Sequence, residues 1–359
     1  MNESDMKHHH YILEVFQYYY TPILVHLGAL GNALSVYVIF RTKLRKLSSS
    51  YYLVALSISD TIFLITIFIL WLQMNGINIF NKPIVCPLMI YLSGVVGCMS
   101  VWVVMAFTAE RFVAVMYPLK SKFMCTVSRA KIIIFTLLSI AMIVYSPQLL
   151  FADVIDHPVT NKSVCDVKAE WQREAHIFNI FDFIATFVVP MSVITVLNAC
   201  IIKNIWKFSE VRRKLTNTKL EGNAARSRKS KNKSSQNLTK MLVIVSTVSV
   251  VMNLPSYICR ILAYLIAADV LGVPASMIDS FILFQQLSQI LFYTTFGINF
   301  ALYCISGQNF RRSVATVFRM CNNDRPSENS PMPDNKTQST GSTGSKKRRT
   351  PTRWVEEVL

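Results

Sequence analysis

The chain has 359 residues, of which 52% are hydrophobic and only 16% are charged. Soluble domains usually carry about 25% charged residues, so this chain lacks the groups that keep a protein surface in water. Its formal net charge of +17 would suit a nucleic-acid-binding protein, but the basic residues are gathered in a few segments between long apolar runs. The composition therefore excludes an ordinary soluble domain and indicates a membrane protein.

Seven apolar runs are long enough to cross a bilayer, which takes about 20 residues of helix. They cover residues 23–40, 53–72, 90–115, 132–151, 177–205, 241–265 and 281–303. Lipid offers no partners to backbone polar groups and the runs do not alternate with a period of two, so they predict helices and not a barrel. A soluble all-α protein would need more polar helix faces. The predicted fold class is an all-α membrane protein, a seven-transmembrane helix bundle over residues 23–303.

Residues 1–22 contain acids, several tyrosines and three adjacent histidines, without the basic-then-apolar order of a cleaved signal peptide. We expect an extracellular N-terminal tail here, with the first span as the targeting signal. The histidines at 8–10 are interpreted as ordinary tail sequence and not as a metal site.

The basic residues predict the orientation of the bundle. Lys and Arg are concentrated after the first, third, fifth and seventh runs, whereas the connections 73–89, 152–176 and 266–280 are mixed or acidic. An excess of Lys and Arg marks cytoplasmic segments, so the amino terminus is predicted outside and the carboxyl terminus inside. The basic segments then face anionic membrane lipid and cytoplasmic partners, and no nucleic acid is needed to explain them.

Two cysteines, Cys86 and Cys165, fall in the predicted extracellular connections. That compartment is oxidising, so a disulfide between them is expected. On the same side, Asn2 and Asn161 begin the N-x-S/T sequences of glycosylation acceptors.

Asp60 lies deep in the second run with no base next to it. A carboxyl group at that depth needs a counter-ion, a bound cation or a proton. Asn32, Ser100 and Asn299 lie at depths where they could converge on it. Two interpretations stay open: a hydrogen-bonded polar cluster alone, or a cluster that also holds a sodium ion.

Glu110 and Arg111 end the third run at its predicted cytoplasmic end. They are either two interfacial residues that reach toward water or a latch. In the latch, Arg111 is bonded to Glu110 at rest and is released when neighbouring helices move.

Taken in order, these motifs resemble the rhodopsin-like, class A G protein-coupled receptors over about residues 20–322. The matching positions are Gly31, Asn32, Asp60, Cys86, Ser100, Glu110, Arg111, Pro118, Leu119, Cys165, Pro190, Pro255, Asn299 and Tyr303. The resemblance implies a plasma-membrane receptor that couples to heterotrimeric G proteins and is regulated by receptor kinases and arrestin. It implies activation roles for Glu110, Arg111, Pro118, Leu119, Pro255, Asn299 and Tyr303. No enzyme signature is present, so we do not expect an enzyme.

The chain departs from the family pattern at six positions. They are Phe112, Leu138, Asn198, Ser235, Asn253 and Phe300, of which Phe300 replaces the proline of the seventh span. We expect a weaker bend there and altered switching. The departures leave open a receptor-like scaffold or ligand sequestrant with weak or no signalling. A transporter would predict inverted repeats, which the sequence does not contain.

The outer halves of the spans indicate the ligand. Ser93 stands where amine receptors carry aspartate, and Tyr293 stands where opsins carry their lysine, which argues against an amine and against retinal. The candidate pocket is rich in aromatic and amide groups around one cation, and comprises Trp71, Gln73, Ser93, Gly97, Gln148, Tyr257, Arg260, Tyr264, Gln285 and Gln289. A guanidinium pairs well with a carboxylate or an amide oxygen. The alternative is that Arg260 reaches outward and the glutamines bond across helices. We expect a short, amidated peptide, because the sequence resembles thyrotropin-releasing-hormone-type and invertebrate neuropeptide receptors.

The cytoplasmic end is predicted to carry a second kind of membrane contact. Phe310, Val314, Val317 and Phe318 share one face of an amphipathic helix over residues 304–321, which would lie on the membrane. Cys321 is either palmitoylated or free. Residues 322–359 are of low complexity and are predicted to be disordered, with kinase sites, and the final EEVL could add a strand to a PDZ domain.

Overall fold

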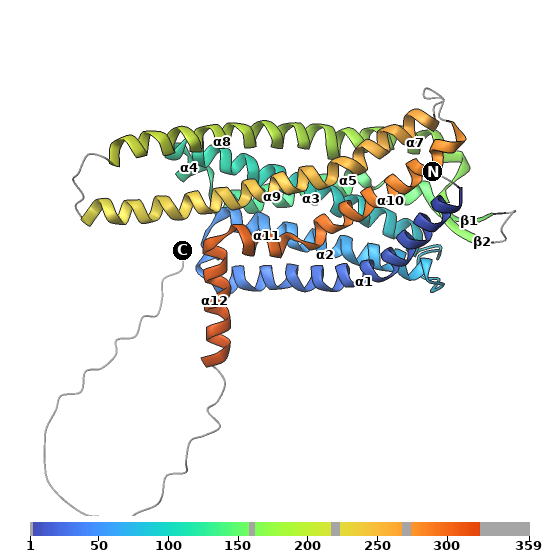
Figure 1. Ribbon diagram of the computed structural model, residues 1–359, viewed down its shortest axis with the longest axis horizontal. Helices are drawn as coiled ribbons and strands as arrows, with labels where there is room; N and C mark the ends of the chain where they lie inside the picture. The colour runs from blue at the N-terminus through green and yellow to red at the C-terminus, as the bar shows by residue number, and fades with distance from the viewer. Residues whose placement is uncertain (1–2, 158–161, 217–222, 268–273, 324–359) are drawn as a thin grey trace, which may run out of the picture.

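A computed structural model describes residues 3–157, 162–216, 223–267 and 274–323 of the chain. The long helices lie side by side along the long axis of the molecule, and α12 leaves them at a steep angle (Figure 1). In chain order the long helices are α1 (Glu3–Arg41), α2 (Ser48–Met74), α3 (Val85–Met116), α5 (Val127–Tyr145), α7 (Gln172–Phe183), α8 (Val189–Thr216), α9 (Asn223–Ala267), α10 (Ala275–Gly297) and α12 (Gln308–Asn323).

Shorter elements connect or extend these helices. They are η1 (Lys43–Lys46), α4 (Pro118–Met124), α6 (Gln148–Phe151), η2 (Ala169–Trp171), the π-helical turn η3 (Ile184–Val188) and α11 (Asn299–Ser306). The strands β1 (Ala152–His157) and β2 (Lys162–Val167) form an antiparallel hairpin in which Val154 is opposite Cys165. We call the end of the bundle that carries this pair the hairpin end, and the end where α12 leaves the bundle the α12 end (Figure 1).

The predicted fold class is confirmed. Within the described ranges, six helical segments are long and apolar enough to cross a membrane, and the bent pair α10–α11 supplies a seventh span. Large apolar side chains face outward, as on α5, where Ile132, Phe135 and Ile143 are 64%, 66% and 72% exposed. The interior instead holds polar side chains, among them Asn32, Ser35, Ser57, Asp60, Ser100 and Asn299. This distribution is expected where the surrounding solvent is lipid.

The helix α1 begins at Glu3, whereas the sequence indicated a tail up to residue 22. Contacts with other helices account for the extension. The ring of Tyr18 packs on Trp71 at 5.7 Å between centroids, and the Trp71 indole donates a hydrogen bond to the Tyr18 carbonyl oxygen at 3.1 Å. The Tyr20 hydroxyl is 2.6 Å from Thr294 Oγ1 on α10. These contacts hold residues of α1 that hydropathy alone assigns to water.

The seventh span bends by 64° between α10 and α11, although Phe300 replaces the usual proline. The expectation of a weak bend at this place is therefore not met. On one side of the break Gly297 lies close to α1, where an added Cβ would be 2.6 Å from Leu24 Cδ1. On the other side the Asn299 side chain donates to Asp60 at 2.5 Å. Packing and one buried hydrogen bond hold a bend that sequence comparison would assign to proline.

The C-terminal helix α12 lies where the sequence predicts an amphipathic helix. Phe310 and Val317 are buried, and Arg311 and Arg312 are exposed. The side chain of Cys321 and residues 324–359 lie outside the described parts of the chain, so lipidation, disorder of the tail and the PDZ motif stay predictions.

The close approach of α1 and α10 gives a test of this packing. A Cβ at Gly28 would be 2.7 Å from the Gly297 Cα and 2.8 Å from Leu64 Cδ1, so Gly28→Ala should force the helices apart. We expect a loss of about 1–3 kcal/mol and a lower melting temperature of the purified protein. Gly97→Ala is the control, because its Cβ would be 3.5 Å from Phe63, which is ordinary contact. Equal melting temperatures for both variants would contradict the close packing.

Candidate functional site

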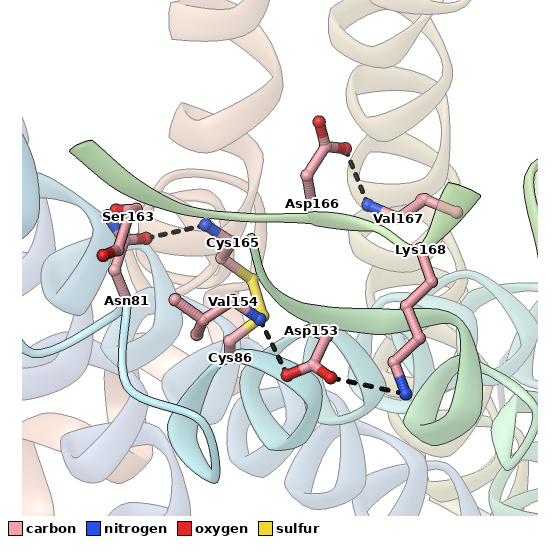
Figure 2. The surroundings of a disulfide bond; sticks show 9 residues. All are labelled: Asn81, Cys86, Asp153, Val154, Ser163, Cys165, Asp166, Val167 and Lys168. Carbon is pink, nitrogen blue, oxygen red and sulfur yellow. Dashed lines mark hydrogen bonds and ion pairs between the residues drawn. A yellow bond between two sulfur atoms is a disulfide. The ribbon is translucent and has the colours of Figure 1, made fainter. Parts of the chain in front are cut away.

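The hairpin end is held by the disulfide between Cys86, in the first turn of α3, and Cys165 on β2 (Figure 2), as the sequence predicted. Asn81 fixes the hairpin beside it, because its Oδ1 accepts from the Cys165 N–H at 3.0 Å and its Nδ2 donates to the Ser163 carbonyl at 2.9 Å. The disulfide thus attaches the strand β2 to the first turn of α3.

At the base of the same hairpin Asp153 accepts a hydrogen bond from the Val154 N–H at 2.8 Å and lies 3.4 Å from the Lys168 ammonium. The backbone donor, and then Lys168, hold the pKa of Asp153 below its usual value. The Asp153 carboxylate therefore stays charged at neutral pH. The glycosylation candidates Asn2 and Asn161 lie outside the described residues.

In the middle of the bundle, Asp60 connects three helices. It has no exposed surface, its Oδ1 accepts from Ser100 Oγ at 2.7 Å, and its Oδ2 accepts from Asn299 Nδ2 at 2.5 Å. Asn32 instead donates to the Phe296 carbonyl at 3.1 Å, and its own Oδ1 is buried without a hydrogen-bond partner. The structure thus brings together Asp60, Ser100 and Asn299, whereas Asn32 is bonded to Phe296 on α10.

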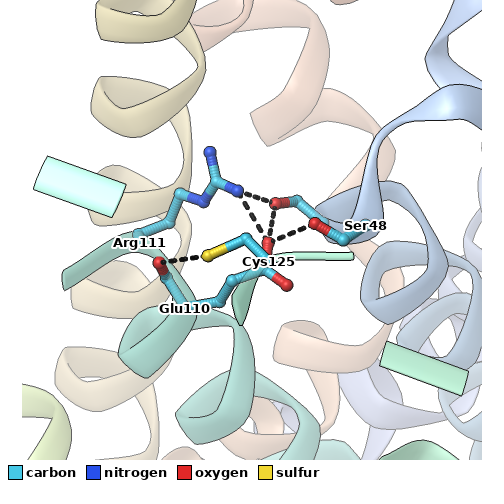
Figure 3. A network of polar contacts seen from close by, with 5 residues as sticks. Ser48, Glu110, Arg111 and Cys125 are labelled. Carbon is cyan, nitrogen blue, oxygen red and sulfur yellow. Dashed lines mark hydrogen bonds and ion pairs between the residues drawn. The ribbon is translucent and has the colours of Figure 1, made fainter. Parts of the chain in front are cut away.

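At the α12 end, Arg111 is buried and bonded within the protein (Figure 3). One guanidinium nitrogen lies 2.7 Å from Glu110 Oε1 and also donates to Ser49 Oγ. The same Glu110 oxygen accepts from Ser48 at 2.9 Å and from Ser49 at 2.5 Å, while the Cys125 thiol contacts the Glu110 carbonyl at 3.8 Å. The Glu110–Arg111 pair is thus bonded to the start of α2. Sequence reasoning missed Ser48 and Ser49, which gave no signal beyond a run of three serines.

Next to this pair, α4 presents apolar side chains to the surroundings. Pro118 begins the helix, and Leu119 and Phe123 are 79% and 77% exposed. Tyr303 on α11 is fully buried, and its hydroxyl has no hydrogen-bond partner. Pro255 lies inside α9.

Toward the hairpin end, Arg260 on α9 forms an ion pair that the sequence did not predict. Its Nη1 lies 2.8 Å from Asp182 Oδ2 on α7, and the two side chains are 30% and 16% exposed. The Tyr145 hydroxyl donates to the other Asp182 oxygen, and Arg260 Nη2 donates to the Asn179 carbonyl at 3.3 Å. Tyr264 lies close enough to the same guanidinium to interact with it electrostatically. Arg260 therefore does not simply reach outward. The signal for its partner was present, since Asp182 is the one acid within the fifth apolar run.

Five of the ten candidate ligand residues line one or both of two cavities. A cavity of about 430 Å³ between α1, α2 and α10 is lined by Trp71 and Gln289 among others. A second, of about 320 Å³ between α9 and α10, is lined by Tyr257, Arg260, Gln285 and again Gln289.

Other predicted residues lie outside these two linings. Ser93 donates to the Ile90 carbonyl at 2.8 Å, Gly97 faces Phe63, and the side-chain oxygens of Gln73 and Gln148 are buried without a partner. Neither cavity is thus lined by Gln73, Ser93, Gly97 or Gln148.

Two departures from the family pattern form bonds between helices. Asn198 on α8 donates to Ser246 on α9 at 2.8 Å, and Asn253 on α9 accepts from Thr295 on α10 at 3.3 Å. A third link uses the π-helical turn η3, where the Ala185 carbonyl accepts from the Trp102 indole at 3.0 Å. Such turns shift the hydrogen-bond ladder of a helix by one residue and are frequent at functional sites.

The fold and these motifs define a seven-helix membrane protein with a disulfide at one end and a buried acid–arginine pair at the other. A family model described as 7 transmembrane receptor (rhodopsin family) matches residues 31–303, so the chain belongs to the rhodopsin family of seven-transmembrane receptors. The predicted resemblance is confirmed. Members of this family are receptors and not enzymes.

Similar proteins include several receptors named for peptides. The chain is 24% identical to an FMRFamide receptor of Drosophila melanogaster over 84% of this chain and 53% of that receptor. It is 23% identical to a QRFP-like peptide receptor of Branchiostoma floridae, over 83% and 76% of the two chains. It is 27% identical to the thyrotropin-releasing hormone receptor of Mus musculus, over 85% and 79%. The chain thus spans about half the length of the first of these relatives and about three quarters of the others.

The Asp182–Arg260 pair can be tested by a double-mutant cycle. Asp182→Asn or Arg260→Gln alone should lower the melting temperature, because each leaves a half-buried charge without its partner. The double variant should recover part of the loss, with a coupling of about 0.5–3 kcal/mol. Asp153→Asn is the control: its side chain is 43% exposed, so loss of its ion pair with Lys168 should cost little. Strictly additive losses would show that the pair contributes no interaction energy.

Proposed function

We propose that this protein is a plasma-membrane receptor for a short peptide and that it activates heterotrimeric G proteins. In this proposal the hairpin end faces the outside and the α12 end faces the cytosol, as the distribution of Lys and Arg favours. The similar proteins named above are called receptors for FMRFamide, a QRFP-like peptide and thyrotropin-releasing hormone, which supports a peptide ligand.

The observation that carries the proposal is the bonding of Arg111 at the α12 end. Arg111 is buried and held by Glu110 and Ser49, in an arrangement suited to a resting state. An agonist that binds better to a second arrangement would shift the equilibrium toward it. Outward movement of α8 and α9 would then open space beside Arg111, and loss of its bonds to Glu110 and Ser49 would let it contact the G protein, with the exposed Leu119 on the neighbouring α4. Nucleotide exchange takes place on the G protein.

The Asp60 cluster fits a sodium ion. Its possible oxygen ligands are the Asp60 carboxylate, the Ser100 hydroxyl, and the buried Asn32 Oδ1 and Ser57 Oγ, which have no hydrogen-bond partner, whereas Asn299 presents its amide nitrogen to Asp60. Hard cations prefer oxygen ligands of this kind. Under this proposal the ion lies among Asn32, Asp60, Ser100 and Asn299 and would neutralise the carboxylate.

Other partners follow from segments outside the described residues. Receptor kinases and arrestin would act on the Ser/Thr-rich sequence within residues 324–359, and a PDZ domain would take the terminal EEVL. The remaining alternative is a receptor-like scaffold or ligand sequestrant, which binds peptide without G protein signalling.

A signalling screen tests the proposal and this alternative together. Cells that express the full chain should give a calcium or cyclic AMP response to at least one peptide of a panel of short amidated neuropeptides. Arg111→Ala should remove the response and leave surface expression and peptide binding in place, because it removes the group released toward the G protein. Binding without any response in the unaltered protein would instead favour the sequestrant.

The latch predicts a change in basal activity. Ser49→Ala removes one hydrogen bond to Arg111 and one to Glu110. A hydrogen bond to a charged group contributes about 1.5–3 kcal/mol, so the ratio of active to resting receptor should rise about tenfold or more. The measurement is agonist-free nucleotide exchange on a purified G protein. Ser50→Ala is the matched control, since Ser50 is buried in the same turn without a side-chain bond to the pair. The same basal exchange in both variants would count against the latch.

A further inference from the structure

The cavity of about 430 Å³ near the hairpin end exists because α1 continues well beyond the expected first span. Its walls come from the first half of α1, between Glu14 and Thr21, from the last turns of α2, and from Gln289 to Tyr293 on α10. The α1 wall lies entirely within the segment that the sequence assigned to a tail. The cavity is therefore a feature of the folded chain that hydropathy does not predict.

The walls of this cavity are fixed by contacts between side chains. Trp71 is bonded to the Tyr18 carbonyl and stacks on Phe68 with 5.5 Å between ring centroids. Gln289 donates to the Tyr293 hydroxyl at 2.6 Å. Because the walls are already ordered, a ligand group that enters would lose little free energy in organising them.

The chemistry of the lining selects one kind of ligand group. Glu14 is the only acidic or basic residue of the lining, and four aromatic side chains line the same space, namely Tyr18, Tyr20, Trp71 and Tyr293. No Lys or Arg lines this cavity. Among the residues whose side chains the structure describes, which here begin at His8, Glu14 has no hydrogen-bond or ion-pair partner. A carboxylate with aromatic faces attracts a cation both by charge and by the ring quadrupoles.

We propose that this cavity binds a cationic group of the ligand, a guanidinium or an ammonium, with Glu14 as its counter-ion. The proposal rests on the proposed function in one respect, namely that the ligand is a peptide. Gln289 lines both this cavity and the one that contains Arg260, so the two spaces adjoin. A peptide that places a basic side chain beside Glu14 would reach Arg260 with an acceptor group further along its chain.

Charge-selective labelling of a cysteine in the cavity tests this without a known agonist. Met74 lines the cavity and is 74% exposed, so Met74→Cys in the purified full chain, in lipid nanodiscs, places a reactive thiol there. The modification rates by a cationic and an anionic methanethiosulfonate reagent are measured by mass spectrometry of the peptide that contains residue 74. Chains without the substitution report the background from native cysteines.

The cation-to-anion rate ratio should fall about three- to tenfold when Glu14→Gln is added, because a nearby unit charge changes the local concentration of charged reagent. Glu174→Gln removes the same charge from α7, also toward the hairpin end but not from the cavity lining, and should leave the ratio unchanged. A fall of the same size in both variants, or no fall in either, would overturn the proposal.

Protection by small probes then tests binding directly. N-acetyl-arginine amide at millimolar concentration should slow labelling of Cys at position 74, the uncharged N-acetyl-citrulline amide should slow it much less, and Glu14→Gln should abolish the difference. Equal protection by the two probes would refute a cation site. These measurements need no G protein. A signalling screen without any response would therefore count against the proposed function and leave the cation site in place. Equal protection by the two probes, together with a signalling response, would refute the cation site and leave the proposed function in place.

Discussion

Asp60 is a carboxyl group with no solvent-exposed surface, and the arrangement of the bundle around it follows from the need to satisfy its oxygens within the protein. In lipid there is no water to do so, and an unsatisfied polar group costs several kcal/mol. Ser100 supplies one hydrogen bond from α3 and Asn299 supplies the other from the first residue of α11. Because Asn299 directly follows the 64° bend, the bond that satisfies Asp60 also holds the direction of the last part of the seventh span. Asp60 thus links α2 to α3 and to the first residue of α11.

Two of the six residues that depart from the family pattern form hydrogen bonds between helices. Asn198 bonds α8 to α9, and Asn253 accepts from Thr295 and so bonds α9 to α10. Interhelical hydrogen bonds in membranes contribute about 0.6 kcal/mol on average, so each is weak enough to break when α9 moves. Signal transfer along the bundle needs an element with two arrangements that both ends can bias. Under the proposed function α9 would be such an element, since Arg260 bonds it to α7 near one end and Asn198 and Thr295 bond it to α8 and α10 further along.

Much of this structure was predictable from the sequence because lipid sets strict conditions on it. The lengths of the apolar runs predicted the seven spans, and the oxidising compartment predicted for two cysteines led to the Cys86–Cys165 disulfide. The depth of Asp60 in its span predicted three neighbours, of which Ser100 and Asn299 contact it directly. What hydropathy could not give depends on contacts between distant segments. The first half of α1 is helical against α2 and α10, and the bonding of Arg111 to Ser49 joins residues 62 positions apart. Asp182 is the instructive omission, because a lone acid in an apolar run carries the same signal that singled out Asp60.

The Asp182–Arg260 pair limits which ligand groups Arg260 can accept under the proposed function. The guanidinium has five N–H donors on its three nitrogens. Nη1 bonds to Asp182 and Nη2 bonds to Asn179, so N–H groups remain for a further acceptor. The pair is already neutral overall. A peptide carboxylate bound to Arg260 would place a second negative charge beside the Asp182 carboxylate. Two carboxylates that share one guanidinium repel each other strongly in a half-buried setting. A neutral amide carbonyl would meet no such repulsion and could share the guanidinium with Asp182. The ion pair thus favours a peptide whose end is amidated over one with a free carboxylate, and it does so through a residue that contributes no hydrogen-bond donor of its own.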